Sequence, residues 1–149
     1  MSNYLRRAAS LATTGLLFAC GVAFAPAAHA VTYTLTVNPT APLREYIPTL
    51  HRNIAHVSGT ASCTGGLPAD VAVALSQDGA DGEEISGGGS VFIACDGRPH
   101  TWAVDIQGAV DLAGLPLLRN WNPGPATVEA NMGGTLGTTF HGTITLTTG

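Results

Sequence analysis

The feature that most constrains the fold of this chain is an alternation of apolar and polar residues with a period of two. In residues 31–37, Val-Thr-Tyr-Thr-Leu-Thr-Val, every odd-numbered residue is apolar and every even-numbered residue is threonine. Successive side chains of a β-strand point to opposite faces, so this pattern predicts a strand with one buried face and one wet face. Almost no segment carries the 3.6-residue period of an amphipathic helix.

The same alternation returns along the chain between turns rich in Gly, Pro and Asn. Asp96-Gly97, between two such runs, is a strong hairpin signal. About seven short strands predict an all-β domain, an antiparallel β-sandwich with immunoglobulin-like layers, and a small closed barrel is the alternative. Trp102 follows the second cysteine, so immunoglobulin strand order is not expected. The expected strands are residues 31–37, 54–63, 69–77, 90–95, 100–106, 126–132 and 140–146.

Residues 1–30 have the composition of a secretory signal peptide. Arg6 and Arg7 precede an apolar stretch, and Ala28-His29-Ala30 supplies the small-x-small pattern that signal peptidase requires. The apolar run is shorter than a bilayer-spanning segment. We therefore expect residues 1–30 to be removed and residues 31–149 to form a single secreted domain. Lipid anchoring through Cys20 is the alternative, although bulky Phe18 does not suit a lipoprotein signal.

Removal of the leader would leave two cysteines, Cys63 and Cys95. Each ends an expected strand directly before a tight turn, so a returning strand between them brings both to the same pole. Export permits oxidation, and we expect a Cys63–Cys95 disulfide worth about 3–4 kcal/mol in the chain-entropy model. We expect Trp102 in the core beside this bridge, surrounded by Val71, Val73, Ile93, Val104, Val128 and Ile144.

The charge of the chain argues against nucleic acid as a partner. All ten acidic residues follow residue 30, where only four arginines oppose them. An acidic surface repels phosphate backbones. The one acidic cluster, residues 78–84, lacks the spacing of an EF-hand loop, so we expect a solvated hairpin tip, with a weak calcium site as the alternative.

The sequence contains no strong catalytic or metal-binding motif. The Gly-x-Ser-x-Gly pattern of a nucleophile elbow is missing. His51, His56 and His141 are scattered singly, without the paired spacing of metal ligands. His100 lies close to Asp96 in sequence, and we expect it to form a hydrogen bond at the turn. No catalytic residue, metal or cofactor is therefore expected.

Two segments, residues 38–53 and 107–125, do not follow the strand pattern and are expected to be long connections. The second contains the candidate binding residues, which are Leu115, Leu117, Leu118 and Trp121. They could fold back over an open end of the sandwich or form an exposed binding patch. We expect most of them to be buried, with Trp121 the most exposed.

Several motifs follow one another after Ser58: Ser-Gly-Thr-Ala-Ser-Cys at 58–63, Val-Ala-Val-Ala-Leu-Ser-Gln at 71–77, Cys-Asp-Gly-Arg-Pro-His-Thr-Trp at 95–102 and Pro-Gly-Pro-Ala at 123–126. In these motifs the chain resembles a family of small secreted actinobacterial proteins classed as a domain of unknown function. The resemblance implies a secreted β-sandwich with a Cys63–Cys95 bridge and brings no known activity. Residues 38–53 are longer than the corresponding connection of that family.

These observations lead to one expected function and two alternatives. We expect a non-enzymatic secreted binding module, whose partner is an unknown protein or a component of the cell envelope. The first alternative is a carrier of a small apolar molecule, with a cleft lined by Leu115, Leu117, Leu118 and Trp121. The second is an extracellular hydrolase, for which the sequence offers no nucleophile–base pair.

Overall fold

The computed structural model describes residues 30–134 and 137–149. The predicted signal peptide, with Cys20, lies outside the described residues except for Ala30. Strands and one short 3-10 helix make up the described elements: β1 (Tyr33–Val37), β2 (Thr40–Ile47), η1 (Pro48–Leu50), β3 (Arg52–Cys63), β4 (Ala69–Asp78), β5 (Glu84–Ile93), β6 (His100–Leu112), β7 (Leu115–Arg119), β8 (Gly124–Met132) and β9 (Thr138–Thr148). No helix in these two ranges is long and apolar enough to cross a membrane.

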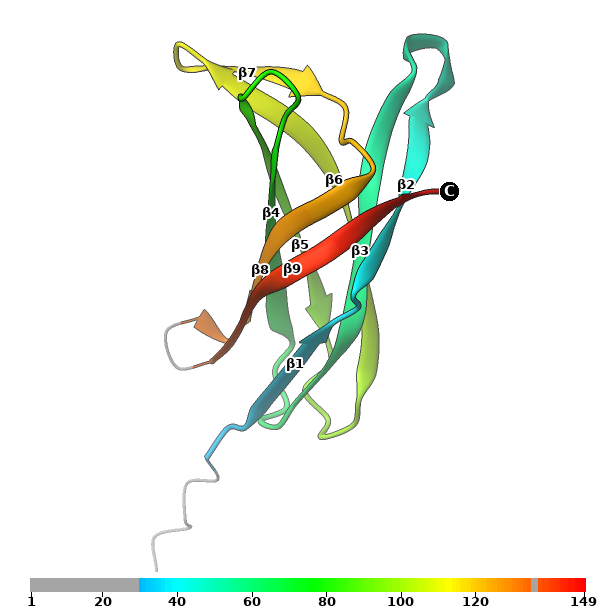
Figure 1. Ribbon diagram of the computed structural model, residues 1–149. Coiled ribbons are helices and arrows are strands. Elements are labelled where there is room, and N and C mark those ends of the chain that lie inside the picture. Colours follow the sequence, from blue (N-terminus) through cyan, green and yellow to red (C-terminus); the bar gives the residue numbers. More distant parts are fainter. Residues whose placement is uncertain (1–29, 135–136) are drawn as a thin grey trace, which may run out of the picture.

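The strands form one sheet that closes on itself as a barrel, so the predicted β-sandwich is wrong (Figure 1). The order β3-β2-β9-β8-β4-β5-β6 returns to β3 through the β3–β6 pairing, which runs from Ile54↔Gln107 to Ala61↔His100. β1 extends the sheet beside β3, and β7 extends it beside β6. The all-β class and the single disulfide are confirmed, and the closed barrel is the architecture named as the alternative.

The barrel is mixed because one pair of its strands is parallel. β2 lies beside β9 with the register Thr40↔Thr145 to Leu43↔Thr148, and both strands run in the same direction. We expected a long connection where β2 lies, because Pro39, Pro42 and Pro48 interrupt the strand pattern there. This short strand pairs with β3 on one side and with β9 on the other. It thereby completes the closed sheet.

The predicted alternation does mark the buried face of the strands. β4 alternates strictly between inward and outward residues, and the six residues expected around Trp102 are all buried. Trp102 itself is 3 % exposed and packs over Gly59, where an added Cβ would lie 2.7 Å from its ring. Its placement in the core is therefore confirmed. Trp102 lies on β6, directly across from Gly59 of β3, the strand that ends at Cys63.

β5 begins earlier than predicted, at Glu84 instead of residue 90, and runs through a row of glycines. A Cβ added to Gly87 would lie 2.8 Å from Ile106 Cγ2, and one added to Gly89 would lie 2.6 Å from Val104 Cγ1. The glycines thus allow β5 and β6 to approach closely. Because glycine has no side chain, this half of the strand shows no alternation of apolar and polar residues in the sequence.

The turns of the barrel gather at two ends. We call one the disulfide end, where β3 joins β4, β5 joins β6 and β8 joins β9. The other is the hairpin end, where β2 joins β3, β4 joins β5 and β6 joins β7. In Figure 1 the hairpin end is uppermost, and the β2–β3 and β6–β7 hairpins extend beyond the body of the barrel there.

Candidate functional site

The disulfide joins the last residue of β3 to the segment after β5, as predicted. The Cα atoms of Cys63 and Cys95 are 4.5 Å apart, and both residues are buried. Two backbone hydrogen bonds flank the bridge: Gly97 N–H donates to Cys63 O at 2.9 Å, and Gly66 N–H donates to Cys95 O at 3.0 Å. These contacts tie the β3–β4 and β5–β6 turns together.

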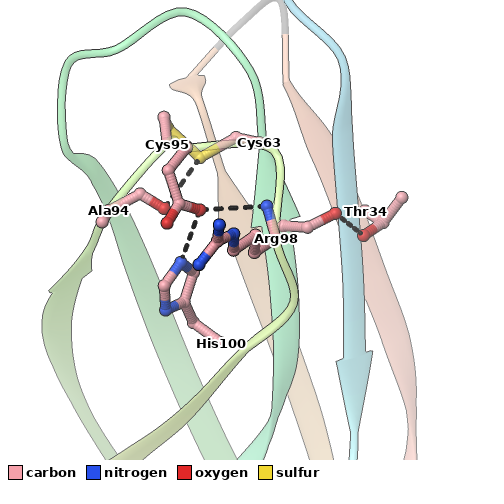
Figure 2. Close-up of polar contacts among 8 residues, drawn as sticks. Thr34, Cys63, Ala94, Cys95, Arg98 and His100 are labelled. Carbon is pink, nitrogen blue, oxygen red and sulfur yellow. Dashed lines mark hydrogen bonds and ion pairs between the residues drawn. A yellow bond between two sulfur atoms is a disulfide. The ribbon is translucent and has the colours of Figure 1, made fainter.

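His100 forms the hydrogen bond that its position suggested (Figure 2). Its Nε2 lies 2.8 Å from Asp96 Oδ1, which also accepts the Arg98 N–H at 2.9 Å. The hydrogen bond from His100 and, secondarily, that from Arg98 lower the pKa of the Asp96 carboxyl below its ordinary value. Both bonds close the turn after Cys95, so this pair has a structural explanation.

His51, His56 and His141 do not gather into a metal site within the described part of the chain. His56 Nδ1 lies 2.6 Å from Asp105 Oδ1, its cross-strand neighbour on the outer face, and His51 Nδ1 lies 3.6 Å from Glu45 Oε1. No group of three or more His, Cys, Asp or Glu side chains able to hold a metal ion occurs within residues 30–134 and 137–149. Both pairs lie on the outer wall or at the hairpin end.

The acidic segment, residues 78–84, forms the turn between β4 and β5. Gly79 N–H donates to Glu83 O at 2.7 Å, and Gly82 N–H donates to Gly79 O at 3.0 Å. Arg119 Nη2 lies 3.3 Å from Glu83 Oε2 and thereby connects this turn to β7. Asp78, Asp81 and Glu84 are exposed. Calcium binding by this turn stays a prediction.

Trp121 is buried, although we expected it to be the most exposed of the four candidate binding residues. It is 1 % exposed, and its Nε1–H donates to Ile106 O at 2.9 Å. Asn53 holds its backbone on both sides, accepting from Trp121 N at 2.9 Å and donating to Trp121 O at 2.9 Å. The indole fits over Gly108, where an added Cβ would lie 3.1 Å from the ring. These partners are distant in sequence, which is why the local pattern did not reveal the burial.

The three leucines, which we expected to be mostly buried, are exposed. Leu115 is 68 %, Leu117 46 % and Leu118 47 % exposed, and every residue of β7 is exposed. β7 pairs with β6 from Gly108↔Arg119 to Leu112↔Leu115, so the segment expected to be an irregular loop is a hairpin. Neighbours on one strand face opposite sides, so Leu117 and Leu118 put apolar surface on both faces of this hairpin.

Further exposed apolar residues lie at the same end. Tyr46 and Leu50, at the tip of the β2–β3 hairpin, are more than half exposed, as is Leu112 at the end of β6. We name this set of side chains the apolar pole: Tyr46, Leu50, Leu112, Leu115, Leu117 and Leu118. Tyr46 and Leu50 lie in residues 38–53, which we expected to be a long connection, and they are not among the four candidate binding residues.

Polar contacts join the base of the β6–β7 hairpin to the residues at the tip of the β2–β3 hairpin, where β3 begins. Arg52 Nη1 donates to Leu118 O at 2.9 Å, Asn53 N–H donates to Asn120 Oδ1 at 3.2 Å, and Asn120 Nδ2 donates to His51 O at 2.8 Å. Nearby, the buried Gln77 accepts from Asn122 N at 3.0 Å and donates to Asn122 O at 2.9 Å. The apolar pole therefore stands on a hydrogen-bonded base.

No protein-family model matches this chain, and no curated protein matches it. The resemblance to small secreted actinobacterial proteins stays an expectation.

Proposed function

We propose that this protein is an extracellular, non-enzymatic binding module that engages a protein partner through the apolar pole. The observation that carries the proposal is the projecting β6–β7 hairpin, in which Leu115, Leu117 and Leu118 leave 46–68 % of their surface exposed. Large aliphatic and aromatic groups presented by a firm scaffold are what binding hot spots are made of.

The base of the hairpin supports this function because it limits the motion of the leucines. The bonds from Arg52 to Leu118 O and from Asn53 to Trp121 O hold β7 and the residues after it against β3. A surface that is already ordered loses less conformational entropy when a partner binds. Buried Trp121 thus contributes by positioning the hairpin, while the leucines present the contact surface.

The free edge of β7 does not favour the addition of a partner strand. Pro116 has no N–H to donate, and Leu118 O already accepts the Arg52 guanidinium. Both features blunt an edge strand against pairing with another chain. We therefore assign recognition to the side chains of the apolar pole and not to backbone pairing.

The charges around the apolar pole define the chemistry of the partner. Exposed carboxylates at this end come from Glu45, Asp78, Asp81 and Asp111, and Arg44 and Arg119 are exposed there as well. Because carboxylates outnumber arginines around the apolar centre, it complements a protein surface that is apolar in the middle and carries more basic than acidic groups at its rim. The same carboxylates disfavour the anionic headgroups of a membrane surface.

The carrier alternative receives less support from these positions. It needs a cleft lined by Leu115, Leu117, Leu118 and Trp121, but Trp121 lies in the core while the leucines lie on an outer hairpin.

Export is supported by the predicted leader and by the Cys63–Cys95 bridge, because disulfides persist in oxidising compartments.

A photo-crosslinking experiment tests the proposal. A benzophenone amino acid replaces Leu117 in one variant and Thr143, on the outer wall of β9, in a control variant, in cells that produce the protein. We expect one protein adduct specific to position 117, and we expect Leu118→Asp to abolish binding of that purified partner in a titration. If the adducts at positions 117 and 143 are the same, or the partner binds Leu118→Asp unchanged, the proposal fails.

A further inference from the structure

A recess lies at the disulfide end, away from the apolar pole. It is a pocket of about 610 Å³, lined by residues of β1, of the 64–68 connection and of the ends of β4, β5 and β8. This volume is within the range of small-molecule sites. Its lining combines Tyr33, Leu67 and Phe92 with the carboxylate of Asp70.

The walls of this pocket are held by covalent and hydrogen-bonded contacts. Cys95 lines the pocket and is bridged to Cys63. In the 64–68 connection, Thr64 N–H donates to Thr32 O at 3.2 Å, and Gly66 N–H donates to Cys95 O at 3.0 Å. The recess is therefore a preformed feature of this end.

Gly133 positions one aromatic wall of the pocket. A Cβ added to Gly133 would lie 2.6 Å from Tyr33 Cζ, so only glycine lets the Tyr33 ring lie this close to the end of β8. The other aromatic wall is Phe92, 71 % exposed, which is the direct cross-strand neighbour of Asp70. The two aromatic rings of the pocket thus come from different strands, β1 and β5.

Asp70 supplies the charge of the pocket. The lining contains no arginine, lysine or histidine, so no cation of the lining faces this carboxylate. Asp70 Oδ1 is buried and accepts no hydrogen bond from the described residues. A buried acceptor without a donor is costly, and a ligand that supplies the donor recovers that cost.

We propose that this pocket binds an organic ammonium ion, a small molecule that carries a primary or secondary ammonium on an aromatic or aliphatic body. Its N–H donates to the Asp70 carboxylate, whose two oxygens share the negative charge. The positive charge lies near the faces of Phe92 and Tyr33, as in known cation–π sites. The apolar body lies against Leu67, and an anionic ligand is repelled by the carboxylate.

This site is independent of the proposed function, because it lies at the opposite end and shares no residue with the apolar pole. A role in binding the ligand also explains why the large apolar side chain of Phe92 is exposed on the otherwise polar outer face of β5.

Three indole compounds with the same body and different charge test the proposal. Tryptamine carries an ammonium, tryptophol a neutral hydroxyl and indole-3-propionate a carboxylate. Binding to the full protein is followed by calorimetry and by backbone amide shifts. We expect tryptamine to shift amides around Asp70 and Phe92, and to bind about tenfold tighter than tryptophol, with indole-3-propionate weakest.

Two variants and a control complete the experiment. Asp70→Asn keeps the shape and removes the charge, so tryptamine should lose its advantage over tryptophol. Phe92→Ala should weaken both compounds without unfolding the protein, because this side chain is mostly exposed. Asp78→Asn makes the same change at the hairpin end and should leave binding unchanged. Equal binding of all three compounds, shifts elsewhere on the barrel, or an unaltered preference in Asp70→Asn would overturn the proposal.

Discussion

Gly87 illustrates how a single missing side chain decides the distance between two strands. Its position on β5 faces the barrel interior, where Ile106 and the backbone of Gln107 on β6 occupy the space that a Cβ would need. Gly88, the next residue, faces outward, where an added Cβ would lie 3.1 Å from Val73 O. The two glycines therefore compare a severely crowded position with a less crowded one on the same strand.

We expect Gly87→Ala to reduce the free energy of unfolding by about 1–3 kcal/mol, because the new methyl group forces β5 away from β6. Gly88→Ala should cost less, since its added Cβ would lie 3.1 Å from one backbone atom, Val73 O, and alanine also restricts the unfolded chain. Urea denaturation of both variants checks the prediction. A loss of equal size at both positions would contradict it.

The ionisation of Asp96 makes the stability of the folded protein depend on pH in the acid range. The hydrogen bonds from His100 and Arg98 lower its pKa in the folded protein, so the ionised carboxyl stabilises the fold. This contribution is fully present above the pKa of the unfolded chain and is lost as the pH falls through the lower pKa of the folded state. Asp96→Asn removes it while keeping an acceptor for the Arg98 N–H.

We therefore expect the melting temperature of Asp96→Asn to lie below that of the wild type near neutral pH. The gap should narrow as the pH falls below about 4, where the wild-type carboxyl also loses its charge. Thermal melts across that range measure it. A gap of constant size would show that the variant loses packing and not charge.

At the scale of elements, the β6–β7 hairpin separates its own residues into support and contact surface. Trp121 follows β7 and is held by Asn53 and Ile106, while Leu118 points out of the hairpin. The two residues are close in sequence, yet they differ completely in burial. Substitutions at these two positions should therefore have opposite consequences.

We expect Leu118→Asp to leave the melting temperature within a few degrees of the wild type, because a half-exposed side chain contributes little packing. Trp121→Ala should cost about 3–5 kcal/mol, as for other large buried side chains. Calorimetry of the two variants provides the measurement. Unfolding of Leu118→Asp would mean that the hairpin packs against the barrel, and the apolar pole would not exist as described.

At the scale of the whole molecule, the disulfide closes the end of the barrel that carries the pocket around Asp70. Cys63 and Cys95 are 32 residues apart in sequence, and the segment between them contains all of β4 and β5. A bridge across such a segment limits the unfolded chain and holds the β3–β4 and β5–β6 turns together.

Replacing both cysteines with alanine should cost about 2–5 kcal/mol. The double variant should also bind tryptamine more weakly, because Cys95 lines the pocket, while contacts at the hairpin end should persist. Denaturation of the wild type with and without reductant provides the matching comparison. An unchanged midpoint under full reduction would show that the barrel does not depend on the bridge.

Part of this architecture was readable from the sequence because it depends on local spacing. Alternation along 69–77 marked the buried residues of β4, and the turn residues after Cys63 and Cys95 placed the bridge at one pole. His100 and Asp96 are close enough in sequence for their hydrogen bond to be anticipated. In each case the partners lie within one strand, one turn or one returning strand.

Only the tertiary structure decided between a sandwich and a barrel. Alternation specifies which face of a strand is buried, and both architectures bury one face of every strand. The choice depends on β2 pairing with β9 and β3 pairing with β6, contacts between segments far apart in the chain. The burial of Trp121 likewise depends on distant residues: Asn53 holds its backbone, and Gly108 leaves room for its indole. The three leucines are exposed because their hairpin extends beyond the core. Burial at such positions is a property of distant partners, which local sequence does not encode.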